Sequence, residues 1–207
     1  MSLRCLFLKR PFDAALSGFG IILSFPFWIV FALLIWFEDR GPVFYIQERE
    51  GKAGRIFKAY KFRSMVKDAE KDGIPVQAEK NDPRVTPIGR LLRVTAMDEL
   101  PQLFNIFKGD MSFVGPRALR PEEAERHKKT GTQVVALKDI PGYKERQNVR
   151  PGLTGLAQVY LSADAPRKVK FKYDVFYIRN QSFRLDLGLI IRSFGISFKG
   201  KWEKDQK

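Results

Sequence analysis

The chain has 207 residues, 44% of them hydrophobic, which suits a folded domain with a core and argues against intrinsic disorder. Its formal charge of +14 at pH 7 predicts an anionic partner, and nucleic acid, an anionic bilayer or a phosphorylated substrate would qualify. The single cysteine, Cys5, excludes an internal disulfide, and the single histidine, His127, excludes a Cys/His metal cluster. Any metal would therefore have oxygen ligands, which favours Mg²⁺ or Mn²⁺.

Residues 14–37 form an uncharged, strongly apolar run, and basic residues precede it at positions 4, 9 and 10. At about 1.5 Å per residue, a helix of this length could cross a bilayer. The run is too long and too aromatic for a secretory signal peptide. Both of its flanks are basic, however, and basic flanks prefer the cytoplasmic side of a membrane.

Pro26 lies near the middle of this run, where it removes a helical hydrogen bond and crowds the carbonyl group of Ile22. We therefore expect residues 1–40 to form a re-entrant helix-break-helix whose two ends face the cytoplasm. Ser24 could bond a carbonyl group that is freed at the bend. A straight transmembrane helix with a proline kink is the alternative. Residues 41–207 would form a cytoplasmic domain.

Short aromatic and β-branched pieces follow the apolar run. Residues 43–46 and 56–62 read as the strands of a β-hairpin, with a glycine-containing loop at residues 51–54. The alternation of side chains along the second strand would place Lys61 and Arg63 on one face. A solvated strand face is the ordinary interpretation of such cations.

Residues 66–84 are polar and show no lasting periodicity, so we expect a short helix that runs into a surface loop. Thr86 and Pro87 have the residue types of an N-cap and a first helical position, and they predict a helix through residue 93. Arg93 would then lie one short turn before Asp98, within reach of the same anion.

An amphipathic helix is predicted over residues 98–108, because apolar residues recur at positions 100, 103, 104 and 107 and a glycine follows. Pro101 is tolerated only in a first turn, so Asp98 and Glu99 would lie at the positive end of the helix. Such an end can also hold a phosphate or a metal-phosphate pair. Plain capping is the alternative, because Thr95 and Asp98 match a capping box.

Fewer signals follow in the second half of the chain. Residues 121–129 read as a charged helix. Residues 150–155 contain two glycines and a proline around Thr154, which predicts a tight loop whose amides could hold an anion, with Arg150 at its mouth. Residues 185–198 predict a helix whose apolar positions suit a bilayer interface or the core equally.

Several motifs follow one another along the chain: Asp98-Glu99-Leu100-Pro101-Gln102, Lys108-Gly109-Asp110-Met111-Ser112, Gly115-Pro116-Arg117, Arg-Pro-Gly-Leu-Thr-Gly-Leu-Ala-Gln from residue 150, and Lys-Phe-Lys-Tyr-Asp-Val-Phe-Tyr from residue 170. In this order they resemble the small monotopic polyprenyl-phosphate phosphoglycosyl transferases, which initiate cell-surface glycan assembly in bacteria. The resemblance extends from the first hydrophobic run to about residue 198. One departure is Phe25, which separates Ser24 from Pro26 where that family usually has a serine directly before the proline.

The resemblance implies an α+β fold, with a small cytoplasmic α/β catalytic domain, a β-hairpin and interfacial amphipathic helices at the bacterial inner membrane. It implies transfer of a sugar-1-phosphate from a UDP-sugar to a polyprenyl phosphate such as undecaprenyl phosphate, with release of UMP, in exopolysaccharide or related glycoconjugate biosynthesis. Membrane lipids would be partners, nucleic acid would not, and a homodimer is one assembly that the chain could form. The alternatives are a non-catalytic, membrane-anchored basic binding protein and a metal-dependent phosphoesterase.

The same resemblance suggests a division of roles. Asp98 would be the nucleophile of a covalent aspartyl-phosphosugar intermediate, kept ionised by the helix end and the nearby cations. It would also bind Mg²⁺, with Mn²⁺ as a substitute, while Glu99 would assist the metal or act as a base. Spacing alone would make Asp174 an ordinary helical carboxylate, but the resemblance places it in the site. Phosphate or substrate binding is expected for Lys61, Arg63, Arg93, Arg117, Arg150, Thr154 and Asp174.

Overall fold

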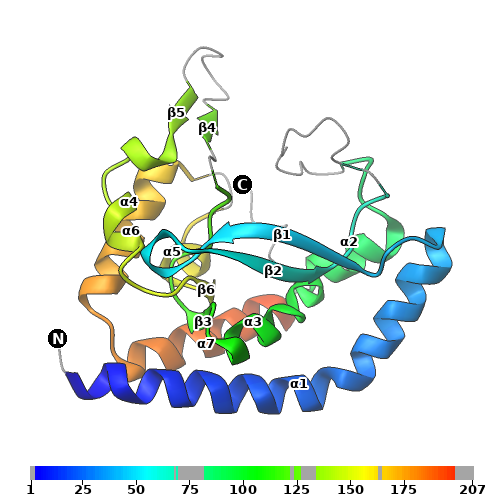
Figure 1. Cartoon of the computed structure of the whole chain (residues 1–207), viewed down its shortest axis with the longest axis horizontal. Coiled ribbons are helices and arrows are strands. Elements are labelled where there is room, and N and C mark those ends of the chain that lie inside the picture. Colours follow the sequence, from blue (N-terminus) through cyan, green and yellow to red (C-terminus); the bar gives the residue numbers. More distant parts are fainter. Residues whose placement is uncertain are drawn as a thin grey trace.

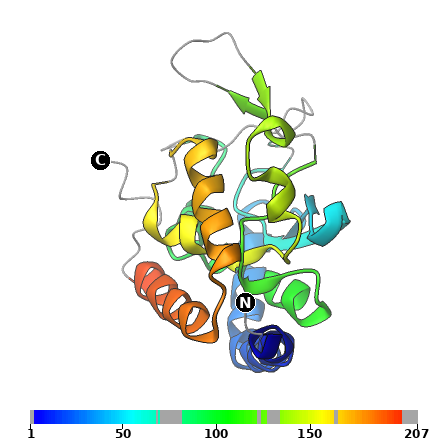
Figure 2. The same ribbon diagram turned by 90° about the vertical axis from the view of Figure 1, so that its left-hand side faces the viewer.

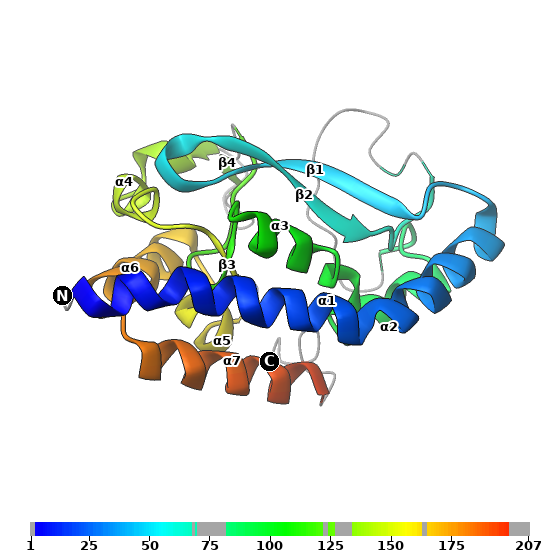
Figure 3. The ribbon, with the colours of Figure 1, turned by 60° about the horizontal axis from the view of Figure 1, so that its bottom comes forward.

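The computed structural model describes residues 3–67, 69, 82–121, 124–126, 134–162 and 165–198, and it confirms a mixed helix and sheet architecture. A long N-terminal helix lies along one side of the molecule, and a β-hairpin crosses the body on the other side of helix α3 (Figures 1 and 3). Within the described residues the strands form three separate two-stranded sheets. Most of the predicted loop at residues 66–84 lies outside the described residues.

Helix α1 (Leu3–Asp39) contains the apolar run and includes both Pro11 and Pro26. It is the helix among the described residues that is long and apolar enough to cross a membrane. Helical hydrogen bonding continues through Pro26, so the expected break is absent; instead the helix bends in its second half (Figure 1). The Ser24 hydroxyl lies 3.5 Å from the carbonyl oxygen of Ile21 and accepts a 2.9 Å hydrogen bond from Trp28 Nε1. It therefore does not serve the carbonyl of Ile22, which Pro26 frees.

Both ends of α1 contact the rest of the protein. Near its start, the Arg10 guanidinium donates 2.6 Å hydrogen bonds to the carbonyl oxygens of Ile106 and Phe107, at the end of another helix. Near its end, Ile35 is buried in a cluster with Phe62 and Leu92. The predicted membrane segment thus packs against the predicted domain near both of its ends.

The predicted hairpin is confirmed as β1 (Phe44–Glu50) and β2 (Ile56–Phe62), with the short 3-10 helix η1 (Lys52–Gly54) in the connection. The strands are antiparallel, and their register runs from Phe44 opposite Phe62 to Glu50 opposite Ile56. Strand β2 ends at Phe62, whose ring is buried against α1.

The helix predicted after Thr86 is confirmed as α2 (Pro87–Val94), and the Thr86 hydroxyl accepts a 3.0 Å hydrogen bond from the amide of Gly89. The 3-10 helix η2 (Met97–Glu99) and helix α3 (Gln102–Lys108) follow. Gly109 ends α3 with a φ of 97°, a left-handed conformation that favours glycine. Helix α3 packs along α1 and buries Leu103 and Ile106 in the main core.

Strand β3 (Ser112–Val114) follows α3 and pairs in parallel with β6 (Gly152–Thr154). Strand β4 (Ala124–Arg126) pairs with β5 (Val134–Ala136), so the charged helix predicted at residues 121–129 is wrong. That segment had little apolar face to hold a helix against a core, whereas pairing with β5 satisfies its backbone. His127 lies outside the described residues.

Five further helices complete the described part of the chain: η3 (Leu137–Asp139), α4 (Tyr143–Arg146), α5 (Leu156–Tyr160), α6 (Arg167–Arg179) and α7 (Phe183–Phe198). Helix α7 confirms the helix predicted at residues 185–198, and it has one buried side and one exposed apolar side. Leu189 and Ile190 are buried in the main core, whereas Ile191 and Phe194 are 62% and 67% exposed. Helices α1 and α7 lie on the same side of the molecule (Figures 2 and 3).

Candidate active site

Asp98 and Glu99 form a carboxylate pair, here called the dyad, in the short helix η2. Strand β2 brings Lys61 to it, with Nζ 2.5 Å from Glu99 Oε1 and 3.9 Å from Asp98 Oδ2. Arg117 reaches it from beyond β3, with one terminal nitrogen 3.5 Å from Glu99 Oε1. The two carboxylate side chains are only 12% and 17% exposed, whereas that of Arg117 is 50% exposed. The dyad therefore has a cation on its open side.

The capping interpretation of this segment is wrong. The Thr95 hydroxyl donates to the carbonyl oxygens of Leu91 and Leu92 at 2.8 and 3.2 Å, so it serves the end of α2. The residue before η2 is Ala96, in a left-handed conformation with φ 57°, and it makes no side-chain cap. Helix α3 begins only at Gln102. The dyad thus lies in a 3-10 turn that precedes the α-helix, and it does not form the first turn of that helix.

The two carboxyl groups of the dyad differ electrostatically. Burial raises the pKa of Asp98 to about 6; the Glu99 charge adds to this rise, and Lys61 and Arg93 only partly oppose it. The pKa of Glu99 is shifted the other way: burial would raise it, but Lys61 and Arg117 hold it well below its usual value. The cations favour the ionised form of Asp98, as expected, but they do not outweigh burial, because the nearest cation is bound to Glu99.

The Arg63 side chain makes its polar contacts with α1 and not with the dyad. Its guanidinium forms an ion pair with Asp39 at the end of α1 and lies 3.5 Å from the carbonyl oxygen of Ile35. Lys61 and Arg63, which are expected to serve one face together, meet different partners: Lys61 contacts the dyad, whereas Arg63 contacts the end of α1. Arg63 fastens α1 to the hairpin.

The centre of the predicted anion-binding loop is instead strand β6 (Gly152–Thr154), whose backbone amide and carbonyl groups bond to the segment around β3. The amide of Gly152 donates to the carbonyl oxygen of Pro116 at 2.9 Å, and the amide of Gly115 donates to that of Thr154. A Cβ atom on Gly115 would lie 2.9 Å from the Gly152 nitrogen, so these glycines permit close approach of two backbones. Arg150 Nε donates to the carbonyl oxygen of Gly109 at 2.8 Å.

Asp174 and Thr154 are both buried. The Thr154 hydroxyl oxygen has no hydrogen-bond partner among the described residues. Asp174 Oδ2 accepts a 2.8 Å hydrogen bond from Arg146 Nε, and Arg146 also donates to the backbone carbonyl of Arg117 at 2.6 Å. Sequence reasoning missed Arg146, because a cation in a four-residue helix carries no pattern of its own.

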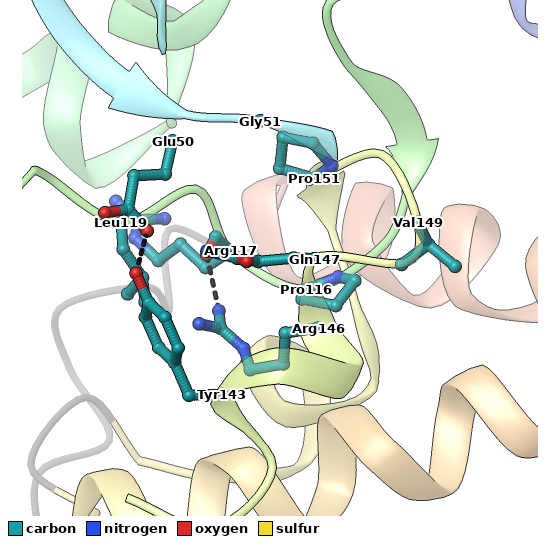
Figure 4. A pocket seen from close by; sticks show the side chains of 10 residues that line it. All are labelled: Glu50, Gly51, Pro116, Arg117, Leu119, Tyr143, Arg146, Gln147, Val149 and Pro151. Carbon is teal, nitrogen blue, oxygen red and sulfur yellow. Dashed lines mark hydrogen bonds between the residues drawn. The ribbon is translucent and has the colours of Figure 1, made fainter. Parts of the chain in front are cut away.

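A pocket opens beside Arg117 between the end of β1, helix α4 and the start of β6 (Figure 4). Arg117 and Arg146 both line it, and Tyr143 donates a 2.6 Å hydrogen bond to Glu50 at its edge. Burial raises the pKa of Tyr143 to about 12, and the neighbouring Glu50 carboxylate adds to the rise. This pocket and the dyad share Arg117.

No group of three or more His, Cys, Asp or Glu side chains forms a metal cluster within the described residues. Mg²⁺, however, commonly binds to one or two carboxylates together with substrate phosphates. The dyad offers two carboxylates beside cations that would hold those phosphates, so it fits such an ion.

The dyad, with Lys61 and Arg117 beside it, has the charge composition that would suit a phosphorylated substrate. Residues 4–200 match the bacterial sugar transferase family. The chain belongs to that family.

Three relatives illustrate the similarity. A UDP-N-acetylgalactosamine-undecaprenyl-phosphate N-acetylgalactosaminephosphotransferase of Aeromonas hydrophila is 40% identical over 191 residues, which cover 90% of this chain and 43% of the relative. A UDP-glucose:undecaprenyl-phosphate glucose-1-phosphate transferase of Klebsiella pneumoniae is 40% identical over 197 residues, covering 93% and 40%. An exopolysaccharide production protein of Rhizobium leguminosarum bv. phaseoli is 41% identical over 191 residues, covering 89% and 92%. The chain thus spans about two fifths of the first two relatives and most of the third.

Proposed function

We propose that this protein transfers a sugar-1-phosphate from a UDP-sugar to undecaprenyl phosphate or a similar polyprenyl phosphate, and releases UMP. The observation that carries the proposal is the dyad: a buried carboxylate with a raised pKa beside Lys61, Arg93 and Arg117. The names of the Aeromonas and Klebsiella relatives give both a UDP-sugar and undecaprenyl phosphate. The Rhizobium relative suggests exopolysaccharide production as the setting.

In the first step, a carboxylate oxygen of Asp98 attacks the phosphorus that bears the sugar. The bond from that phosphorus to the bridging oxygen breaks, and UMP leaves with the electron pair. In the second step, an oxygen of the lipid phosphate attacks the same phosphorus and the Asp98 carboxylate is released. The product is a polyprenyl diphosphate sugar. Two steps allow UMP to leave before the second anionic substrate reacts.

The opposite pKa shifts support different roles for the two carboxylates. A raised pKa makes the Asp98 carboxylate more basic and more nucleophilic, while it stays largely ionised at pH 7. A lowered pKa makes Glu99 a weak base, so its main role is to hold Lys61 and Arg117 in place. These cations would then stabilise charge on the phosphates as it moves to UMP.

Mg²⁺, bound by Asp98 and the diphosphate, would neutralise phosphate charge, and Mn²⁺ would substitute. Asp98 is the better candidate ligand, because Glu99 already contacts Lys61 and Arg117.

We also propose that α1 is re-entrant and that the body of the protein lies on the cytoplasmic face of the bacterial inner membrane. Arg10 fastens one end of α1 to α3, and Arg63 fastens the other end to the hairpin through Asp39. A straight span would separate these ends by a bilayer about 30 Å thick, so one body on one side could not hold both. The basic flanks favour the cytoplasm.

Two experiments test these proposals. Purified protein should release UMP from a UDP-sugar only when polyprenyl phosphate is present. Release without lipid would indicate a phosphoesterase, and no release from any UDP-sugar would favour a binding protein.

For topology, cysteines introduced near residues 2 and 52, after replacement of Cys5, should be labelled from the same side; labelling from opposite sides would contradict the re-entrant geometry. The homodimer stays a prediction.

A further inference from the structure

Asp174 and Arg146 form an enclosed ion pair. Arg146 Nε donates to Asp174 Oδ2 at 2.8 Å, and the two side chains are 6% and 5% exposed. The Arg146 guanidinium also lies over the Phe171 ring, 4.2 Å from its centroid. A buried carboxylate already paired in this way is poorly placed to bind a phosphate, which is itself an anion. Any effect of Asp174 on the dyad would therefore pass through another residue.

The second contact of Arg146 identifies that residue. One terminal nitrogen of Arg146 donates a 2.6 Å hydrogen bond to the backbone carbonyl of Arg117 (Figure 4). Arg117 in turn directs its guanidinium to Glu99, at 3.5 Å. Three groups thus connect helix α6 to the dyad in sequence: Asp174, Arg146 and Arg117.

We propose that Arg146 and Asp174 are positioning residues: Asp174 fixes the Arg146 guanidinium, and Arg146 fixes the backbone at Arg117 so that the Arg117 side chain faces the dyad. This inference rests on the proposed function. Arginine suits the task because its planar fork binds two acceptors in different directions at once, whereas the single ammonium of lysine does not reproduce that geometry.

Kinetic measurements on Arg146→Lys and on the double variant Arg146→Met/Asp174→Leu test the inference. The value of kcat/KM should fall roughly 10-fold to 100-fold in both, the range typical of residues that orient a directly acting group. Replacing a buried ion pair by apolar side chains is often neutral for stability, so thermal unfolding of the double variant should stay close to that of the wild type. Lys144→Met, which removes an exposed cation from the same helix, is the matched control and should keep full activity.

A double-mutant cycle with Arg117→Ala separates positioning from direct action. In the Arg117→Ala background, Arg146→Lys should cost less than about 3-fold, because there is no guanidinium left to position. If the losses multiply instead, Arg146 and Asp174 act by a separate route and the inference is wrong. Full activity in the Met/Leu double variant would overturn it as well.

A readout without turnover keeps this inference distinct from the proposed function. The ¹⁵Nε signal of Arg117, assigned by its loss in Arg117→Ala, should shift and narrow in Arg146→Lys and in the double variant as the side chain becomes mobile. An unchanged signal would overturn the positioning role, whatever the protein catalyses. Absence of lipid-dependent UMP release by the wild type would instead overturn the proposed function.

Discussion

Two clusters of charged side chains in this protein look alike in composition. In the dyad, Lys61 lies 2.5 Å from Glu99, with Asp98 beside it. In the second cluster, here called the α1 clamp and formed by Lys9, Asp13, Tyr177 and Asp186, Lys9 lies 2.5 Å from Asp186. Each cluster joins elements that are far apart in the sequence, and each contains two carboxylates and one lysine.

The two clusters differ in how their charges are completed. In the α1 clamp, Tyr177 donates to Asp186 at 2.6 Å and the Phe113 amide donates to Asp13 at 3.3 Å, so hydroxyl and backbone donors supplement Lys9. In the dyad, Arg93 and Arg117 add positive charge, and the Arg117 side chain is half exposed. The two clusters therefore differ in their cations and not in their carboxylates, and the additional arginines are the feature that favours an anion at the dyad.

The largest expected difference comes from replacing one aspartate by asparagine in each cluster. Asp98→Asn should lower turnover at least roughly 1000-fold, because an amide is a very poor nucleophile, while Asp186→Asn should keep the activity of each folded molecule. Steady-state kinetics should be ping-pong, and a radiolabelled sugar phosphate should stay on the wild-type protein when lipid is withheld. Near wild-type turnover by the Asp98→Asn protein would refute the covalent mechanism.

The Asp98→Asn substitution, which should lower turnover, should raise the stability of the fold. Its folded pKa, about 6, lies above the ordinary value of 3.8, so the ionised form is disfavoured by folding and this cost grows as pH rises between those values. At pH 7, Asp98→Asn should therefore raise the free energy of unfolding, on the order of 1 kcal/mol, as measured by denaturant unfolding. A loss of stability would show that the carboxylate mainly serves packing or capping.

Removal of divalent cations should have the next largest effect. Excess EDTA should lower turnover roughly 100-fold or more, because several kcal/mol of charge stabilisation is lost, and Mg²⁺ or Mn²⁺ should restore it. The melting temperature should stay nearly unchanged, since Lys9, Tyr177 and the Phe113 amide supply the donors of the α1 clamp. Full turnover in EDTA would contradict the metal proposal.

The pH dependence distinguishes the two carboxylates of the dyad. Because the attacking form of Asp98 is the anion, kcat/KM should fall about 10-fold per pH unit below about 6 and level off above it. Glu99 has a lowered pKa and stays ionised through this range. A profile that is flat down to pH 4.5 would mean that Asp98 is as acidic as an exposed carboxyl group.

The smallest effect is expected in the α1 clamp. Lys9→Met leaves Asp186 without its cation and should lower the free energy of unfolding by about 1–3 kcal/mol, less than for a fully buried pair because Lys9 is 21% exposed. The double variant Lys9→Met/Asp186→Leu should recover most of this loss. Activity per folded molecule should stay near that of the wild type in both, and a large loss of it would show that the clamp also shapes the site.

The sequence alone determined the local elements and the residue types of the site. The uncharged apolar run and the turn residues correctly predicted helix in residues 14–37, though not its continuity through Pro26, as well as the hairpin and the helix after Thr86, because these depend on interactions between near neighbours. The ordered motifs were enough to indicate the family, and they placed Asp98, Glu99 and Arg117 in one site.

Only the tertiary structure decided which partner each of these side chains meets. Two residues apart in sequence, Lys61 contacts the dyad and Arg63 contacts the end of α1, because different elements pack beside the two side chains. Adjacent in sequence, Asp98 and Glu99 acquire opposite pKa shifts, because the nearest ammonium binds one and burial dominates the other. Burial and charge pairing depend on contacts between segments dozens of residues apart, and local sequence patterns contain no record of those distances.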